Sequence, residues 1–234
     1  MCQHAWVPLA TYKDLCIDAC DAEAEARFWA GLLGLTAGGP HHNGAWWLDD
    51  DTGQAVAWVN AVPEPKTAKN RLHMDVNAEG LDAALAAGAT VLDDRHKWTV
   101  MRDPDGQEFC LFVRDTPIER RLYELVLDAG QSPEECLAIA EWWSEVLGAE
   151  LGRDDEGYPW LEEVPGAPFE FICFEPVPEP KTVKNRVHID VGTNDVDALV
   201  AHGATVLRAR GDGGLGWTIL ADPDGNEFCA MPAD

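Results

Sequence analysis

The sequence predicts an α+β fold made of two similar domains, and three observations lead to this prediction. A phrase of fifteen residues at 62–76 returns at 177–191 with only three differences, and the register is constant (188 − 73 = 115). An alternating, strand-like segment and then a helical one precede each copy. Asp-Pro-Asp-Gly-x-Glu-Phe-Cys follows each copy, at 103–110 and 222–229. A long period used twice indicates tandem domains rather than a solenoid.

The domain boundary is expected in a short charged segment between the two copies. Residues 114–122 contain a proline and several charged side chains, which is typical of a linker between two cores. We therefore expect domain 1 at 1–113, a linker at 114–122 and domain 2 at 123–234.

The elements of domain 1 follow from hydrophobic periodicity and turn residues. Residues 22–35 carry apolar side chains at helical spacing and end in a glycine-rich stretch, which predicts a helix. Asp49 to Gly53 has turn composition and predicts a hairpin. The other segments are expected as strands at 14–20, 46–48, 54–62, 72–76, 89–92, 98–102 and 108–113, with a short helix at 81–87.

Domain 2 repeats this order. Residues 125–127 match the first strand, 133–147 match the first helix, and 203–207 match 88–92. The register of the last segment is 119, so the second copy has four extra residues in the glycine-rich stretch 211–216. That stretch lacks the flanks of a nucleotide-binding loop, and we expect a mobile lid or a hairpin.

Composition excludes several classes of partner. Asp and Glu number 42 against 17 Lys and Arg, which gives a formal net charge of −25. This charge argues against nucleic acid and anionic membranes as partners. It fits a solvated acidic surface, a cationic or neutral ligand, or a high-salt cytoplasm.

Cysteine usage and hydropathy predict a cytoplasmic protein with reduced thiols. No C-x-x-C pair is present, residues 1–13 show no signal pattern, and no apolar run approaches the length of a membrane span. The seven cysteines are Cys2, Cys16, Cys20, Cys110, Cys136, Cys173 and Cys229.

Together, the Leu-Gly helix ends, the Asn-Arg-Leu/Val-His-Met/Ile-Asp-Val strands and the Asp-Pro-Asp-Gly-x-Glu-Phe-Cys segments resemble the vicinal oxygen chelate superfamily. More narrowly, they resemble its glyoxalase-like, bleomycin-resistance and dioxygenase branch. The resemblance implies paired βαβββ modules that curl into a cup in each domain. It does not choose an activity, because the superfamily contains metal-dependent lyases and dioxygenases as well as metal-free drug-binding proteins.

The resemblance also implies candidate metal ligands. His73 and His188 occupy the position of the family's second-module histidine. The family's glutamate, four residues after the turn glycine, is replaced by Cys110 and by its counterpart Cys229. Glu108 and Glu227 lie two residues earlier and share the face of those cysteines.

Two interpretations of this pattern stay open. His73 with Glu108, and His188 with Glu227, hold a divalent metal in the first. In the second the cups are metal-free, the cysteines fill space, and His73 bonds to a neighbouring strand or to Glu108. The family's first-strand ligand would fall near Asp14 or Cys16 and near Glu124 or Leu125, where no histidine stands.

Basic and aromatic residues complete the candidate binding set. The basic positions are Lys66, Lys69 and Arg71, with Lys181, Lys184 and Arg186 in the second copy. They either clamp an anionic group of a ligand or pair with the protein's own acids, as Arg71 would with Asp75 or Glu108. The strand tryptophans either contact an aromatic or cationic ligand or fill the core; they are Trp47, Trp58, Trp98, Trp160 and Trp217.

The sequence thus favours a metal-free protein that binds or sequesters a drug or metabolite. The alternatives are a metal-dependent lyase or dioxygenase and a structural module in which one domain supports the other. The state of assembly is expected to be a monomer with pseudo-twofold symmetry or a homodimer.

Overall fold

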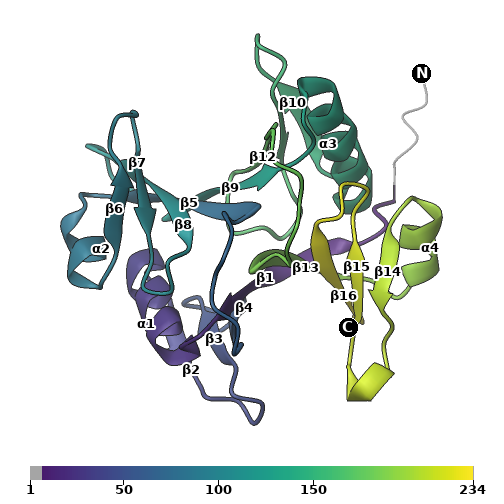
Figure 1. Ribbon diagram of the computed structural model, residues 1–234, viewed down its shortest axis with the longest axis horizontal. Helices are drawn as coiled ribbons and strands as arrows, with labels where there is room; N and C mark the ends of the chain where they lie inside the picture. The colour runs from purple at the N-terminus through teal and green to yellow at the C-terminus, as the bar shows by residue number, and fades with distance from the viewer. Residues whose placement is uncertain (1–6, 234) are drawn as a thin grey trace. The chain divides into compact units, whose positions relative to one another are not determined.

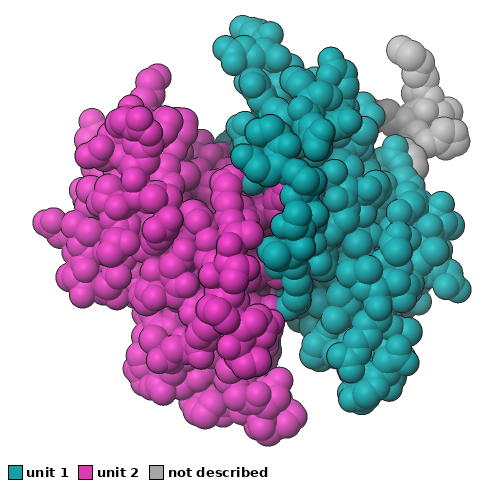
Figure 2. Space-filling view, viewed as in Figure 1, with its two compact units in different colours: residues 1–13, 127–184, 188–234 teal, residues 14–126, 185–187 magenta. Residues whose placement is uncertain are grey.

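The computed structural model describes residues 7–233, which form two compact units (Figures 1 and 2). Unit 1 consists of residues 1–13, 127–184 and 188–234, and unit 2 of residues 14–126 and 185–187. Cys2 lies outside the described residues, and the other six cysteines are free thiols. No helix among residues 7–233 is long and apolar enough to cross a membrane.

Unit 2 contains two β-α-β-β-β modules. The first runs through β1 (Thr11–Ala19), α1 (Ala22–Leu33), β2 (Thr36–Gly38), β3 (Trp46–Asp49) and β4 (Ala55–Ala61). The second runs through β5 (Leu72–Ala78), α2 (Asp82–Ala86), β6 (Thr90–Asp93), β7 (Thr99–Arg102) and β8 (Glu108–Val113). In each module the first and last strands are parallel neighbours and the others are antiparallel, in the orders β1-β4-β3-β2 and β5-β8-β7-β6.

Unit 1 repeats this architecture with the second half of the chain. The third module contains β9 (Leu122–Asp128), of which residues 122–126 belong to unit 2, α3 (Pro133–Leu147), β10 (Glu150–Arg153), β11 (Pro159–Glu162) and β12 (Phe171–Glu175). The fourth contains β13 (Val187–Gly192), α4 (Val196–Ala201), β14 (Thr205–Arg208), the 3-10 turn η1 (Asp212–Gly214), β15 (Thr218–Ala221) and β16 (Glu227–Met231). The predicted α+β fold with repeated βαβββ modules is confirmed (Figure 1).

One detail differs from the sequence-based expectation. The strand β2 was not predicted, because it has only three residues, one of them glycine, and no alternation. The stretch 211–216 lies in the connection of a hairpin, one of the two forms expected for it, because the strands β14 and β15 that it joins are antiparallel partners. This connection contains the turn η1 and is closed at its base by the Gly211 N–H, which donates to Leu215 O at 2.8 Å.

The long helices α1 and α3 begin and end with matching caps. Asp21 accepts a hydrogen bond from the Ala24 N–H, and Ser132 accepts one from the Glu135 N–H. Each helix ends at a glycine in the left-handed conformation, Gly34 (φ 73°) and Gly148 (φ 68°). These caps explain why the helix ends could be predicted within two residues.

An aromatic cluster joins each long helix to the last strand of its unit. The Trp29 ring lies 5.2 Å from that of Phe109, and the Trp143 ring lies 5.1 Å from that of Phe228, both edge-on. All four rings are buried. The clusters fix the position of β8 relative to α1 and of β16 relative to α3, and both strands carry candidate site residues.

A buried pair of carboxyl groups distinguishes the first repeat from the second. Glu25 of α1 and Asp103 are 1% and 4% exposed, and their side chains are hydrogen-bonded to each other. Glu25 Oε1 also accepts a hydrogen bond from Trp29 Nε1 at 2.9 Å. In the second repeat Trp143 Nε1 instead donates to Asp222, and Ile139 stands where Glu25 stood (25 + 114 = 139, as 29 + 114 = 143).

Burial, reinforced by the hydrogen bond and the charge of Asp103, raises the pKa of Glu25 from 4.5 to about 10. The pair therefore holds one proton at neutral pH. The pKa of Glu25 is higher in the folded protein than in the unfolded chain, so the bound proton stabilises the folded state. This contribution is complete below pH 4.5 and is lost as the pH rises toward 10.

We predict that Glu25→Gln removes this pH dependence, because an amide can donate to Asp103 without titrating. The free energy of unfolding of wild type should fall relative to that of the variant as the pH rises, by no more than about 1.4 kcal/mol per pH unit. Urea unfolding between pH 5 and pH 9, inside the window from 4.5 to about 10, measures it. The exposed Glu23→Gln on the same helix is the control. Parallel curves for Glu25→Gln and wild type would show that the pair holds no proton.

Candidate functional site

Three side chains meet on neighbouring strands of unit 2. His73 and Asp75 are two residues apart on β5 and share a face, and Cys110 on β8 is the register partner of Asp75. His73 Nε2 lies 3.2 Å from Asp75 Oδ1 and 3.6 Å from Cys110 Sγ. Asp75 and Cys110 are buried and His73 is partly exposed. We call this group the His73 trio.

Unit 1 contains the same arrangement. His188 Nε2 lies 3.2 Å from Asp190 Oδ1 and 3.3 Å from Cys229 Sγ, with Asp190 and Cys229 paired in register on β13 and β16. All three are buried. Both units thus place a histidine, an aspartate and a cysteine in contact, and each histidine leaves a buried Nδ1 without a hydrogen-bond partner in the described structure.

The thiol of Cys110 is protonated in the metal-free chain. Burial raises its pKa, and the charge and hydrogen bond of Asp75 raise it further. A thiol with this environment is a poor nucleophile, because the thiolate is the reactive form.

Glu108 and Glu227 are engaged by the lysines of the repeated phrase. Lys66 Nζ lies 2.7 Å from Glu108 Oε1, and Lys181 Nζ lies 2.8 Å from Glu227 Oε1. Glu108 also accepts from the Asn70 N–H at 3.2 Å. Burial would raise the pKa of Glu108, but the hydrogen bonds from Lys66 and Asn70 outweigh it and lower that pKa. Both glutamates therefore tie the lysine loop to the last strand.

Arg186 also contacts the protein itself. Its guanidinium donates to Asp105 Oδ2 at 2.6 Å and to the Glu64 carbonyl oxygen at 2.8 Å, all within unit 2. Arg71 is partly exposed and has interactions of its own. The lysine loop thus supplies structural ion pairs through Lys66, Lys181 and Arg186.

The five strand tryptophans are all partly exposed. Trp47 and Trp58 are register partners on β3 and β4, with ring centroids 6.0 Å apart. Trp47 covers Gly38 and Trp160 covers Gly152, where an added Cβ would overlap the indole ring. Trp217 lies directly before β15. Trp47 and Trp160 thus pack over glycines of the edge strands β2 and β10.

Trp98 belongs to an aromatic strip next to the His73 trio. Phe112 follows Cys110 by two residues and so shares its face, and its ring stacks on Trp98 at 5.6 Å. Tyr123 packs edge-on against Phe112 at 5.6 Å, and the Arg114 guanidinium lies over the rings of both, at 5.2 and 5.0 Å. The second repeat has Met231 in place of Phe112 (112 + 119 = 231).

The sequence predicts His73 and Cys110 at this site but not Asp75, Phe112 or Tyr123. The signal for Asp75 was present, because His-x-Asp in a strand puts both side chains on one face and occurs in both copies. No comparable signal marks Tyr123, which reaches the strip only through the fold.

The trio fits a small cation by its donor set. The three ligand atoms lie within 4.8 Å of one another, and imidazole nitrogen, thiolate and carboxylate are all ligands of zinc. His73, Asp75 and Cys110 are therefore the residues of unit 2 that would hold a metal, while Glu108 is bound to Lys66. A metal would also require loss of the Cys110 proton.

Comparisons with known proteins identify the family. A model of the glyoxalase-like domain family matches residues 14–112 and again 124–231. The chain therefore belongs to the glyoxalase-like domain family. No curated protein matches the sequence.

Solved structures share the fold at low identity. Glyoxalase I from Zea mays aligns with a TM-score of 0.64 and 15% identity, covering 95% of this chain and 92% of that one. A dioxygenase-like protein from Bacillus subtilis aligns at 0.62 and 12% identity, covering 96% and 86%. These likenesses concern the fold alone.

We predict that Glu108→Gln destabilises the protein by about 1–3 kcal/mol, because it leaves the largely buried Lys66 ammonium without a counter-ion. Urea unfolding at neutral pH measures the loss. Glu23→Gln breaks an exposed pair with Arg27 and should cost about 0.5 kcal/mol or less. Equal losses in the two variants would contradict a structural role for the Lys66–Glu108 pair.

Proposed function

We propose that this chain is a metal-free binding protein for a small aromatic molecule, of the kind that sequesters a drug or metabolite. The observation that carries the proposal is that, in both repeats, the glutamate on the last strand is paired with a lysine and a buried cysteine stands at the position of the family's glutamate. A site built this way offers hydrogen bonds from its histidine and aspartate, together with apolar surface, in place of the family's glutamate ligand.

The aromatic strip supports an aromatic ligand. Trp98, Phe112 and Tyr123 present partly exposed rings, Phe112 lies on the same strand face as Cys110, and ring stacking favours flat molecules. The His73 Nδ1 atom, which has no hydrogen-bond partner in the described structure, is a polar group that a ligand or a water molecule could satisfy. Since Phe112 is replaced by Met231 in the second repeat, the proposal favours the site in unit 2.

The first test is tryptophan fluorescence of the full chain during titration with flat aromatic compounds, cationic and neutral. We expect a saturable change with at least one compound. Phe112→Ala should weaken binding about tenfold or more, because a stacked ring is lost while the tryptophan reporters stay in place. Met231→Ala is the matched control in the second repeat and should leave the affinity unchanged. Saturable binding that ignores Phe112→Ala would refute the assignment of the strip.

The second candidate is a metal-dependent lyase or dioxygenase, and the geometry of the His73 trio favours it specifically. His73 Nε2 lies 3.2 Å from Asp75 Oδ1 and 3.6 Å from Cys110 Sγ, and nitrogen, oxygen and sulfur donors this close together suit one transition-metal ion. A metal with three protein ligands would supply Lewis-acid chemistry at an open position. His73, Asp75 and Cys110 would hold it, and the aromatic strip would orient the substrate.

Metal analysis of untagged protein, purified without chelator and then incubated with zinc, iron, nickel or manganese, separates the two candidates. The metal-free proposal expects no stoichiometric metal. Metal that is retained in wild type and in Cys136→Ser, but lost in Cys110→Ser, would replace it with the metal-dependent candidate. Cys136 is the matched control because it is buried and its thiol donates to the Ala129 carbonyl, away from the trio.

A further inference from the structure

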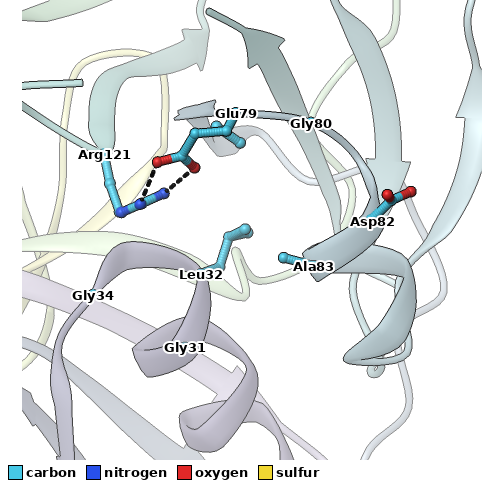
Figure 3. A pocket seen from close by; sticks show the side chains of 9 residues that line it. Gly31, Leu32, Gly34, Glu79, Gly80, Asp82, Ala83 and Arg121 are labelled. Atoms are coloured by element: carbon cyan, nitrogen blue, oxygen red, sulfur yellow. Dashed lines mark hydrogen bonds and ion pairs between the residues drawn. The ribbon is translucent and has the colours of Figure 1, made fainter. Parts of the chain in front are cut away.

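A cavity of about 450 Å³ lies in unit 2, between the end of α1 and the connection from β5 to α2 (Figure 3). The side chains of Leu32 and Ala83 are directed into it, and Ala78 adds to its apolar lining. Arg121 and Glu79 form its polar edge. None of these residues belongs to the His73 trio or the aromatic strip.

One lining residue of the cavity, Gly31, is smaller than its equivalent in the second repeat. A Cβ added at Gly31 would meet nothing within 4 Å. The equivalent of Gly31 is Glu145 (31 + 114 = 145), and the equivalent of Ala87 is His202 (87 + 115 = 202). In unit 1, Glu145 Oε2 lies 3.2 Å from His202 Nε2, and this contact bridges α3 to the end of α4.

Further contacts hold that bridge in unit 1. The Trp142 ring stacks on His202 at 5.8 Å, and Trp142 Nε1 donates to the His202 carbonyl oxygen at 2.8 Å. The second repeat therefore places its own imidazole beside an acidic group between its helices. The first repeat has no counterpart of this bridge, because Gly31 and Ala87 carry no side chain that could form it.

The charges around the open cavity favour a cation. The C-terminal end of α1 carries a partial negative charge, and α1 has no basic residue in its last turn. Glu79 and Asp82 add two carboxylates. Arg121 is the basic residue of the lining, and its two terminal nitrogens are hydrogen-bonded to Glu79 at 3.1 and 2.8 Å. The hydrogen bond from Arg121 lowers the pKa of Glu79, so this carboxylate is charged at neutral pH.

We propose that the cavity between α1 and α2 binds a small organic cation with a short apolar body, of the primary alkylamine class. The alkyl part covers Leu32, Ala78 and Ala83, and the ammonium faces Glu79, Asp82 and the last carbonyl groups of α1. A net charge of −25 on the chain adds to the preference for a cation over an anion. The site is independent of the function proposed for the His73 trio.

The test is an NMR titration of the isotope-labelled full chain with butylammonium chloride, followed through backbone amide shifts. We expect saturable shifts at Gly31, Gly34 and Ala83, with no saturable shift from butyrate and weaker binding of neutral butanol. Gly31→Leu should weaken binding about tenfold or more by filling the cavity. This variant should fold, since the added side chain meets open space and leucine favours helix more than glycine does.

Glu23→Leu, on the exposed part of the same helix, is the matched control and should bind like wild type. Shifts that never saturate, unchanged binding by Gly31→Leu, or butyrate binding as tightly as butylammonium would each overturn the proposal.

Discussion

The most consequential interactions in each unit are the hydrogen bonds made by the two aspartates of the Asp-Pro-Asp-Gly turn. Asp103 Oδ1 accepts from the Gln107 N–H at 2.7 Å, and Asp222 Oδ1 accepts from the Asn226 N–H at 2.9 Å. The second aspartate of each turn accepts a hydrogen bond from a residue distant in sequence. Asp105 accepts from the Cys20 N–H, and Asp224 accepts from the Gly130 N–H. These bonds fix where β8 and β16 begin. The register of β8 on β5 then places Cys110 opposite Asp75.

Most of the fold could be predicted because its signals are local and stated twice. The helix caps at Asp21 and Gly34, the repeated phrase and the Asp-Pro-Asp-Gly turns each specify an element from a few neighbouring residues. The strand β2 carries no such signal, because its three residues become a strand only by pairing with β3. Sequence periodicity cannot reveal a partner that the fold brings from elsewhere.

The site was predictable only in part for the same reason. His73 and Cys110 follow from motif positions, and Asp75 could have followed from strand alternation. The pairing of Glu108 with Lys66 depends on how the loop after β4 folds back to β8. The position of Glu108 in its strand therefore could not predict this partner. The Glu25–Asp103 pair likewise joins a helix to a turn 78 residues away (103 − 25 = 78).

The two repeats keep their lysine–glutamate pairs and histidine trios but differ around them. Ile139 replaces Glu25, Met231 replaces Phe112, and Glu145 and His202 form a bridge that Gly31 and Ala87 cannot form. Shared features lie on the central strands, where a change would disturb several hydrogen bonds at once. Differences lie at helix faces and strand ends, where one side chain can change without altering the register.

The longer connection between β14 and β15 has a practical consequence for protein engineering. The backbone hydrogen bond from Gly211 to Leu215 closes the loop that contains the four extra residues. The glycines at 211, 213 and 214 adopt positive φ angles. The exposed residues of η1 make no contribution to the core. An epitope tag or a fluorescent reporter inserted there would extend a loop that is already closed at its base, which makes it the natural attachment point on unit 1.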